Sequence, residues 1–168
     1  MLQVLTWFRQ KSPHPPVVLE AGACLYTIGY QGYSQVGFVR ALTARSVTIL
    51  CDLRRNAVSR KTDFARMPLS QACASTGIRY EHLWRLGVPS EHGDGRRTAR
   101  DRALRFEDYR VRILPHQKAS LERIHAWLTS GERVALTGFE HSAADCHRSC
   151  VAEQLLRTFG EACIPLHL

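Results

Sequence analysis

Long apolar runs, internal repeats and low-complexity tracts are absent from this chain of 168 residues. No apolar run reaches the ~20 residues that a transmembrane helix needs, so we expect no membrane span and no membrane partner. The first residues do not have the pattern of a secretory signal peptide either. Hydrophobic residues make up 45% of the chain, which is enough for a core of ordinary size. These features indicate a globular protein, which we expect in the cytoplasm.

Cysteine is present, but no spacing suggests a disulfide framework or a zinc site. The six cysteines lie at positions 24, 51, 73, 146, 150 and 163. Four are in apolar or helical contexts, and we expect free thiols in a reducing compartment. A metal site is the alternative for His141, Cys146, His147 and Cys150. Because structural zinc usually needs a second ligand pair, which is missing nearby, we predict no metal and no cofactor.

Lysine is scarce, so the positive charge comes almost entirely from arginine. Lys and Arg number 23 against 15 Asp and Glu, which gives a formal net charge of +8. Arginine favours planar contacts with phosphate through two donors at once. We therefore expect an anionic ligand, with nucleotide or nucleic acid as the leading class. A basic surface that serves only solubility is the alternative.

One polar segment carries five arginines that are candidates for contact with nucleic-acid phosphates: Arg96, Arg97, Arg100, Arg102 and Arg105. Such contacts are independent of base sequence and weaken as salt increases. The alternative interpretation is the solvated face of a helix.

The order of secondary-structure signals predicts one α/β domain over residues 23–168. A proline-rich break at residues 12–16 separates it from an N-terminal arm, residues 1–22. Strands are predicted at residues 24–30, 47–51, 78–83, 134–138 and 164–168. Helices are predicted at residues 34–45, 67–76, 100–111 and 116–129, and from about residue 147 to Gly160, with Pro115 as a break. This alternation favours a three-layer fold, with a mostly parallel sheet of about five strands and helices on both faces.

Four polar loops follow the predicted strands. Right-handed crossovers place loops 30–34, 52–61, 84–97 and 139–147 at the carboxyl edge of the sheet, where open α/β sheets bind ligands. If the second and fourth strands are neighbours, Asp52, Glu140, His147 and Arg148 share one crevice.

The chain resembles a family of domains of unknown function, the family numbered 488. The motifs that carry the resemblance are Tyr26–Tyr30 with Gly32, Asp52–Asn56 with Ser59 and Arg60, Tyr80 with His82 and Leu83, Leu86-Gly87, and Glu140 with Cys146–Ser149. Their order and spacing agree over about residues 25–168. The resemblance implies a cytoplasmic α/β domain without a settled activity. Relatives often have cysteine where this chain has Gly138, so a role for that thiol cannot be carried over to this chain. A second departure is Val88-Pro89 after Leu86-Gly87, where a glycine or a basic residue is more usual.

We predict two groups of site residues at the carboxyl edge. The catalytic candidates are Asp52, Glu140, Cys146 and His147, because a carboxylate or imidazole can serve as general base and a thiolate as nucleophile. The ligand-binding candidates are Tyr30, Arg54, Arg55, Ser59, Arg148 and Ser149. A hydrolase or transferase is one interpretation; a non-catalytic nucleic-acid-binding or adaptor protein and a thiol or metal enzyme centred on Cys146 are the alternatives.

Arg148 lies in the first turn of the last predicted helix, where free backbone N–H groups already favour an anion. The alternative is an ion pair with Asp52 or Asp145 that only holds the loop. The same helix N-terminus and Arg148 are expected to lower the pKa of Cys146. His141-Ser142, five residues, then Arg148-Ser149 matches the phosphate-loop spacing of cysteine phosphatases. Because serine replaces the nucleophilic cysteine, we expect no phosphatase activity by that mechanism.

Overall fold

The computed structural model describes residues 24–89, 98–160 and 164–168. The predicted N-terminal arm, Cys163, Arg96 and Arg97 lie outside these residues.

The core of the molecule is a sheet of five parallel strands in the order β3-β2-β4-β1-β5. The strands are β1 Leu25–Gly29, β2 Ile49–Asp52, β3 Arg79–His82, β4 Val134–Gly138 and β5 Pro165–His167. Each overlaps a strand predicted from the sequence. The prediction of a three-layer α/β fold with a parallel sheet is therefore confirmed.

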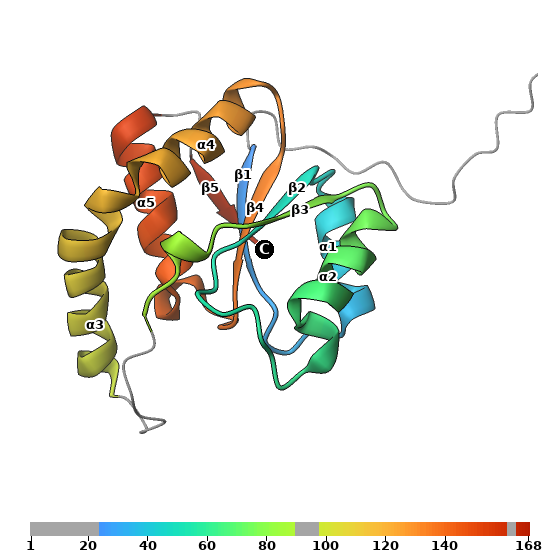
Figure 1. Cartoon of the computed structure of the whole chain (residues 1–168), viewed down its shortest axis with the longest axis horizontal. Helices are drawn as coiled ribbons and strands as arrows, with labels where there is room; N and C mark the ends of the chain where they lie inside the picture. The colour runs from blue at the N-terminus through green and yellow to red at the C-terminus, as the bar shows by residue number, and fades with distance from the viewer. Residues whose placement is uncertain (1–23, 90–97, 161–163) are drawn as a thin grey trace, which may run out of the picture.

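Helices cover both faces of this sheet (Figure 1). One side carries α1 Gln35–Ala44 and α2 Arg66–Ala74, and the other carries α4 Lys118–Thr129 and α5 His147–Phe159. The remaining helix, α3 Ala99–Asp108, lies beyond α5 at the outside of the molecule (Figure 1). None of the helices in the described part of the chain is long and apolar enough to span a membrane.

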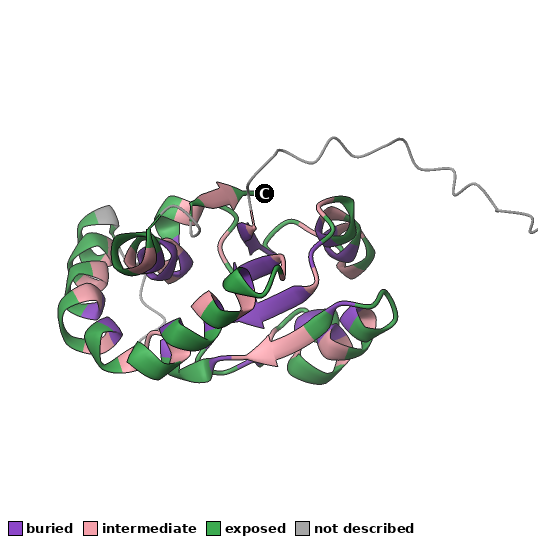
Figure 2. Ribbon diagram, turned by 90° about the horizontal axis from the view of Figure 1, so that it is seen from above, coloured by how far each residue is buried: buried purple, intermediate pink, exposed green. Residues whose placement is uncertain are grey.

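The interior strands β1, β2 and β4 are buried at every position and mostly apolar because both of their faces are covered. Side chains alternate across a strand, so Ile49 and Cys51 of β2 pack in the core beneath α4 and α5, whereas Leu50 packs beneath α1 and α2. Leu136 and Ala135 of β4 divide in the same way. Figure 2 shows the buried central strands between helices whose outer faces are exposed. This alternation accounts for the continuous apolar runs in the sequence.

Local signals fix several helix ends. The Ser34 side chain accepts a hydrogen bond from the Gly37 N–H at 3.1 Å and caps α1, as predicted. The helix α2 is followed by Gly77 with φ of +79°, a conformation that favours glycine. Thr98 and Asp101 cap each other reciprocally at the start of α3.

The predicted break at Pro115 is wrong. Helix α3 continues through a π-helical turn at Tyr109–Ile113 and a 3-10 helix at Leu114–Gln117 into α4. Proline lies in the first turn of the 3-10 helix, where its missing N–H is not needed and its fixed φ fits. The proline therefore changes the hydrogen-bond pattern and the direction of the chain without ending the helical run.

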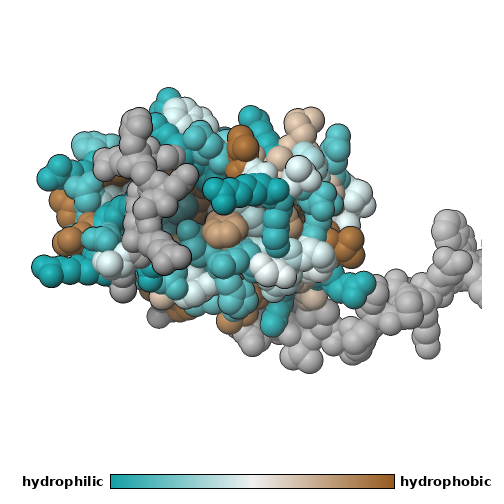
Figure 3. Space-filling model, turned by 90° about the horizontal axis from the view of Figure 1, so that it is seen from below, coloured by the Kyte–Doolittle hydropathy of each residue, from teal (hydrophilic) through white to brown (hydrophobic). Residues whose placement is uncertain are grey.

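The second and fourth strands are neighbours, with Asp52 opposite Thr137. Their carboxyl ends, and the loops that follow, therefore meet at one edge of the sheet. Figure 3 looks onto this edge, which is mostly hydrophilic with separate hydrophobic side chains among the polar ones.

Candidate functional site

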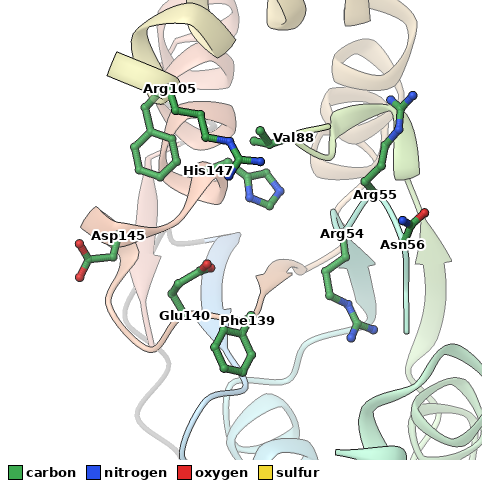
Figure 4. A pocket seen from close by; sticks show the side chains of 10 residues that line it. Arg54, Arg55, Asn56, Val88, Arg105, Phe139, Glu140, Asp145 and His147 are labelled. Carbon is green, nitrogen blue, oxygen red and sulfur yellow. The ribbon is translucent and has the colours of Figure 1, made fainter. Parts of the chain in front are cut away.

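A hollow of about 230 Å³ opens between the loops that follow β2 and β4. Helix α3 and Val88, which lies after β3, complete the wall. The lining residues are Arg54, Arg55, Asn56, Val88, Arg105, Phe106, Phe139, Glu140, Asp145 and His147. In Figure 4 the side chains of Arg105 and His147 point toward one another, and the Glu140 carboxylate is directed toward the same space. The structure thus brings together groups that are far apart in the sequence.

Asp52 lies beneath this hollow and is completely buried. Its carboxylate accepts hydrogen bonds from the Arg54 Nε at 2.9 Å and Nη2 at 2.6 Å, and from the Tyr80 hydroxyl at 2.6 Å. The Arg54 backbone N–H also donates to it, at 3.0 Å. Burial, together with the Asp52 charge, raises the pKa of Tyr80, so this tyrosine remains a donor. Asp52 is fully used by these partners, which suits an anchor for Arg54 and not a base that touches a ligand.

Arg54 joins Asp52 to the loop after β1. Its Nη1 donates to the Tyr30 hydroxyl at 3.1 Å, and that hydroxyl donates to the Ser59 Oγ at 3.4 Å. The Arg54 carbonyl accepts from His82 Nε2 at 2.8 Å. The structure therefore brings the ligand-binding candidates Tyr30, Arg54 and Ser59 into one hydrogen-bonded network; whether they bind a ligand stays a prediction. Tyr80 and His82 also belong to this network, through Asp52 and the Arg54 carbonyl, although neither was among the predicted site residues.

Arg148 lies under the loop after β4, with 1% of its surface exposed. Its Nη1 donates to the Glu140 carbonyl at 2.6 Å and its Nη2 to the His141 carbonyl at 2.8 Å. Among the described residues no carboxylate pairs with it, and its Nε has no hydrogen-bond partner. The alternative of an ion pair with Asp52 or Asp145 is not realised: Asp52 pairs with Arg54, and Asp145 pairs with Arg102 at 3.4 Å. Arg148 therefore shapes the loop from below, and it does not line the hollow.

The loop that matched phosphatase spacing does not form an anion cradle. Two of its backbone N–H groups are used internally: the Asp145 N–H donates to the Ser142 carbonyl at 3.3 Å, and the Cys146 N–H donates to the Ala143 carbonyl at 3.1 Å. The Ser149 N–H and hydroxyl both bond to the Cys146 carbonyl. A short 3-10 helix, Ala143–Asp145, fills the segment. These donors are not available to a phosphate.

Cys146 is buried, with 1% of its surface exposed. Burial, reinforced by the nearby Glu140 charge, raises the pKa of the Cys146 thiol to about 12. The expected lowering by Arg148 is present but is outweighed by burial. The predicted low-pKa thiolate is therefore wrong.

His147 is held as a neutral imidazole. Its Nε2 lies 3.2 Å from the Leu53 carbonyl oxygen. Because a carbonyl only accepts hydrogen bonds, Nε2 carries the proton and donates it. Nδ1 is then the unprotonated nitrogen, and it lies 3.9 Å from the Cys146 Sγ. Burial lowers the pKa of His147. The thiol and the imidazole therefore form a neutral pair at pH 7.

Gly138, the position where relatives often have cysteine, lies directly against this pair. A Cβ at position 138 would lie 2.5 Å from the Cys146 Sγ. The Cys146 thiol thus fills the space that a side chain at the end of β4 would occupy. A side chain at position 138 would require the Cys146 thiol to move.

The metal alternative has no geometric support in the part of the chain that the structure describes, where no three His, Cys, Asp or Glu side chains form a group that could hold an ion. Cys150 packs in the core beneath α4 and α5, whereas His141 is exposed. The four proposed ligands therefore do not converge.

Helix α3 brings part of the arginine segment to the hollow. Arg105 lines it and donates to the Pro89 carbonyl at 2.7 Å. Arg102 lies beside the neighbouring loop through its pair with Asp145, and Arg100 is exposed. Sequence reasoning missed Asn56, Phe139 and Asp145 as lining residues. The sequence did contain a signal for each of them: Phe139 directly follows β4, Asn56 ends the Asp52–Asn56 motif, and Asp145 precedes Cys146.

A search of curated proteins and a search of solved structures each found no match. The family model described as domain of unknown function DUF488 matches residues 35–155. This match includes the loops after β2 and β4 that form the hollow. Because the model covers most of the sequence, the chain belongs to the DUF488 family.

Proposed function

We propose that this hollow binds the phosphate group of a nucleotide or nucleic acid. The observation that carries the proposal is that Arg55 and Arg105 reach the same small hollow from separate segments of the chain. Arg55 follows β2, and Arg105 belongs to α3. In Figure 4 the Arg105 guanidinium lies inside the hollow, whereas the Arg55 guanidinium is turned toward its outer side. Each can bind anionic oxygens of one ligand that extends across the hollow.

The balance of charge in the hollow supports an anionic ligand. Arg54 is neutralised by Asp52, and Asp145 is paired with Arg102. Among the residues that the structure describes, the charges that remain at this hollow are the two arginines of the walls and the Glu140 carboxylate. An anion can therefore enter without displacing a buried ion pair.

Arg55 and Arg105 each make a contact that positions the side chain and leaves guanidinium N–H donors free for a ligand. The Arg55 Cζ lies 4.9 Å from the centre of the Trp84 ring, which orients the side chain at the rim. Arg105 uses Nη2 for the Pro89 carbonyl. Because a guanidinium has five N–H donors, further donors of Arg105 can serve a ligand. Less side-chain entropy is lost on binding when the donors are already oriented.

A hydrolytic or transfer activity is the second candidate, and Glu140 supports it. Its carboxylate lines the same hollow as Arg105 (Figure 4) and is hydrogen-bonded to the Cys146 side chain, which leaves further acceptor positions for a general base. Asp52, the other predicted base, has its oxygens occupied by Arg54 and Tyr80. A non-catalytic binding protein would use the same arginines without Glu140.

Titration calorimetry with AMP and with inorganic phosphate tests the proposal. Arg55→Gln and Arg105→Gln should each weaken AMP binding by about 1.5–3 kcal/mol, roughly 10- to 100-fold, the scale of a hydrogen bond to a charged group. Arg157→Gln is the matched control, because Arg157 is exposed near the far end of α5. Absence of AMP and phosphate binding to the wild type, or equal weakening by Arg157→Gln, would contradict the proposal.

Glu140→Gln separates the two candidate functions. It should abolish turnover of a phosphodiester or nucleotide substrate while AMP binding is kept or strengthened, because a negative charge is removed from the hollow. If the wild type binds AMP without turnover of such substrates, the non-catalytic interpretation holds.

A further inference from the structure

The phosphate hollow continues into two neighbouring hollows along α3. One, of about 330 Å³, lies between the loops after β1 and β4 and is lined by Gln31, Phe139 and Ser142 among others. The second, of about 360 Å³, lies between α3 and the loop after β4. Asp145 lines all three, so they adjoin one another. The described residues of this edge thus form an open groove and not one enclosed pocket.

An open groove suits a chain-like ligand. The first hollow, about 230 Å³, is smaller than the ~300–1,000 Å³ pockets that usually enclose small molecules. A ligand bound there by its phosphate must extend out of it. The adjoining hollows provide a continuation in the direction of Phe139 and α3.

Phe139 lies where two of the hollows meet. Its ring is 46% exposed although it is large and apolar. Tyr30 supports it by an edge contact, with ring centroids 5.3 Å apart and planes at 75°, and Tyr30 is itself stacked on Phe64 at 4.6 Å. The Phe139 backbone is fixed by the Gln31 N–H, which donates to its carbonyl at 2.8 Å. The exposed ring is therefore supported on one side by Tyr30 and leaves its other surface open to a ligand.

We propose that the ligand of this groove is single-stranded nucleic acid, with its phosphates bound by Arg105 and by Arg55 and an unpaired base stacked on Phe139. The inference rests on the proposed function and adds the ligand class. Aromatic rings beside arginines bind single strands because every base has a face to stack and every nucleotide a phosphate.

A duplex does not satisfy the same contacts. Its base faces are stacked on one another and do not reach an aromatic ring in a narrow groove. Its phosphates can still contact the exposed arginines of α3. Preference for single strands therefore depends on Phe139, and general affinity depends on the arginines.

Fluorescence anisotropy with a labelled single strand of about ten nucleotides, in DNA and RNA forms, tests the inference against a duplex of the same length. Unlabelled AMP and inorganic phosphate are competitors. The single strand should bind at least about tenfold more tightly than AMP and than the duplex. Its affinity should fall as salt increases, with a slope set by the number of phosphates contacted.

Phe139→Leu keeps an apolar side chain and removes the aromatic face. It should weaken single-strand binding by about fivefold or more, the scale of one base–aromatic stack, and leave inorganic phosphate binding unchanged. Phe159→Leu is the matched control, because Phe159 stacks on His125 at 4.1 Å near the far end of α5. Thermal unfolding of each variant corrects the affinity for the folded fraction.

The outcomes distinguish the two proposals. If AMP binds with the expected dependence on Arg105 but the single strand binds no more tightly, the ligand class is overturned and the phosphate site stands. If the duplex binds as tightly as the single strand, or Phe139→Leu and Phe159→Leu weaken binding equally, stacking on Phe139 is overturned. If none of the probes binds, both proposals are overturned.

Discussion

At the scale of single residues, burial decides which of the polar groups of this edge can react. Cys146 and His147 are adjacent in sequence and in space, yet burial raises the pKa of the thiol and lowers the pKa of the imidazole. Each group is thereby kept neutral, and neither is a ready nucleophile or acid. Glu140 differs because its carboxylate lines the hollow.

His147 makes stability depend on pH in a defined direction. Because its folded-state pKa lies below the ordinary ~6.5, the unfolded chain binds the proton first as pH falls. The contribution of His147 to the free energy of unfolding is complete above pH ~6.5. It is lost as the pH falls from there toward the folded-state pKa of His147. Urea unfolding at a series of pH values should show this loss in the wild type and less of it in His147→Gln, whose amide can still donate to Leu53. His116→Gln, at an exposed position, should retain the wild-type dependence; identical curves for all three proteins would refute the assignment.

At the scale of elements, one arginine ties a helix to a functional loop. Arg148 of α5 holds the Glu140 and His141 carbonyls, and a Cβ at Gly29 would lie 1.7 Å from the Glu140 oxygen. The loop after β4 thus packs closely against Gly29 at the end of β1, and the Arg148 guanidinium donates hydrogen bonds to two of its carbonyls. The position of Phe139 and Glu140 in the groove follows from these contacts.

Arg148→Lys and Arg148→Met should both destabilise the protein, because a lysine cannot reach two carbonyls with the same geometry and a methionine leaves both without a donor. We expect a loss of about 3 kcal/mol or more for Met, the scale of removing two hydrogen bonds to a charged group. Denaturant unfolding measures the loss, and phosphate titration at low temperature measures binding per folded molecule. A Met variant with wild-type stability but no phosphate binding would reverse the assignment and make Arg148 a ligand contact.

At the scale of the whole molecule, each end of the parallel sheet carries a tryptophan with two arginines beside its ring. Trp84 follows β3 at the carboxyl edge, with Arg55 at 4.9 Å and Arg85 at 5.4 Å from its ring centre. Trp127 lies near the start of β4, with Arg79 at 5.5 Å and Arg123 at 5.0 Å. Only the first of these clusters includes a residue that lines the groove.

Trp84→Leu and Trp127→Leu therefore form a matched pair. Trp84→Leu should weaken AMP binding several-fold, because Arg55 loses the ring that orients it, a contact worth about 0.5–1 kcal/mol at an exposed site. Trp127→Leu should change thermal stability but not affinity. Calorimetry and thermal unfolding on both variants provide the comparison, and equal losses of affinity would show that the orientation of Arg55 by Trp84 does not matter.

The strands and helices were predictable from sequence because their signals are local. The runs that became β2 and β4 are continuously apolar at Ile49–Cys51 and Val134–Leu136, as in strands covered on both faces. Ser34 marked the start of α1 through its capping hydrogen bond, and Gly77 marked the end of α2 through its positive φ. Pro115 misled because a proline fits the first turn of a 3-10 helix as well as it ends an α-helix.

The site was only partly predictable. The sequence by itself determined that the polar residues after β2 and β4 share one edge, since parallel strands end together. The tertiary structure decided that Asp52 binds Arg54 and Tyr80 beneath the surface, that Arg148 points at backbone carbonyls, and that Arg105 enters the hollow from α3. These outcomes depend on burial and side-chain direction, which arise from contacts between residues far apart in the chain and leave no local pattern in it.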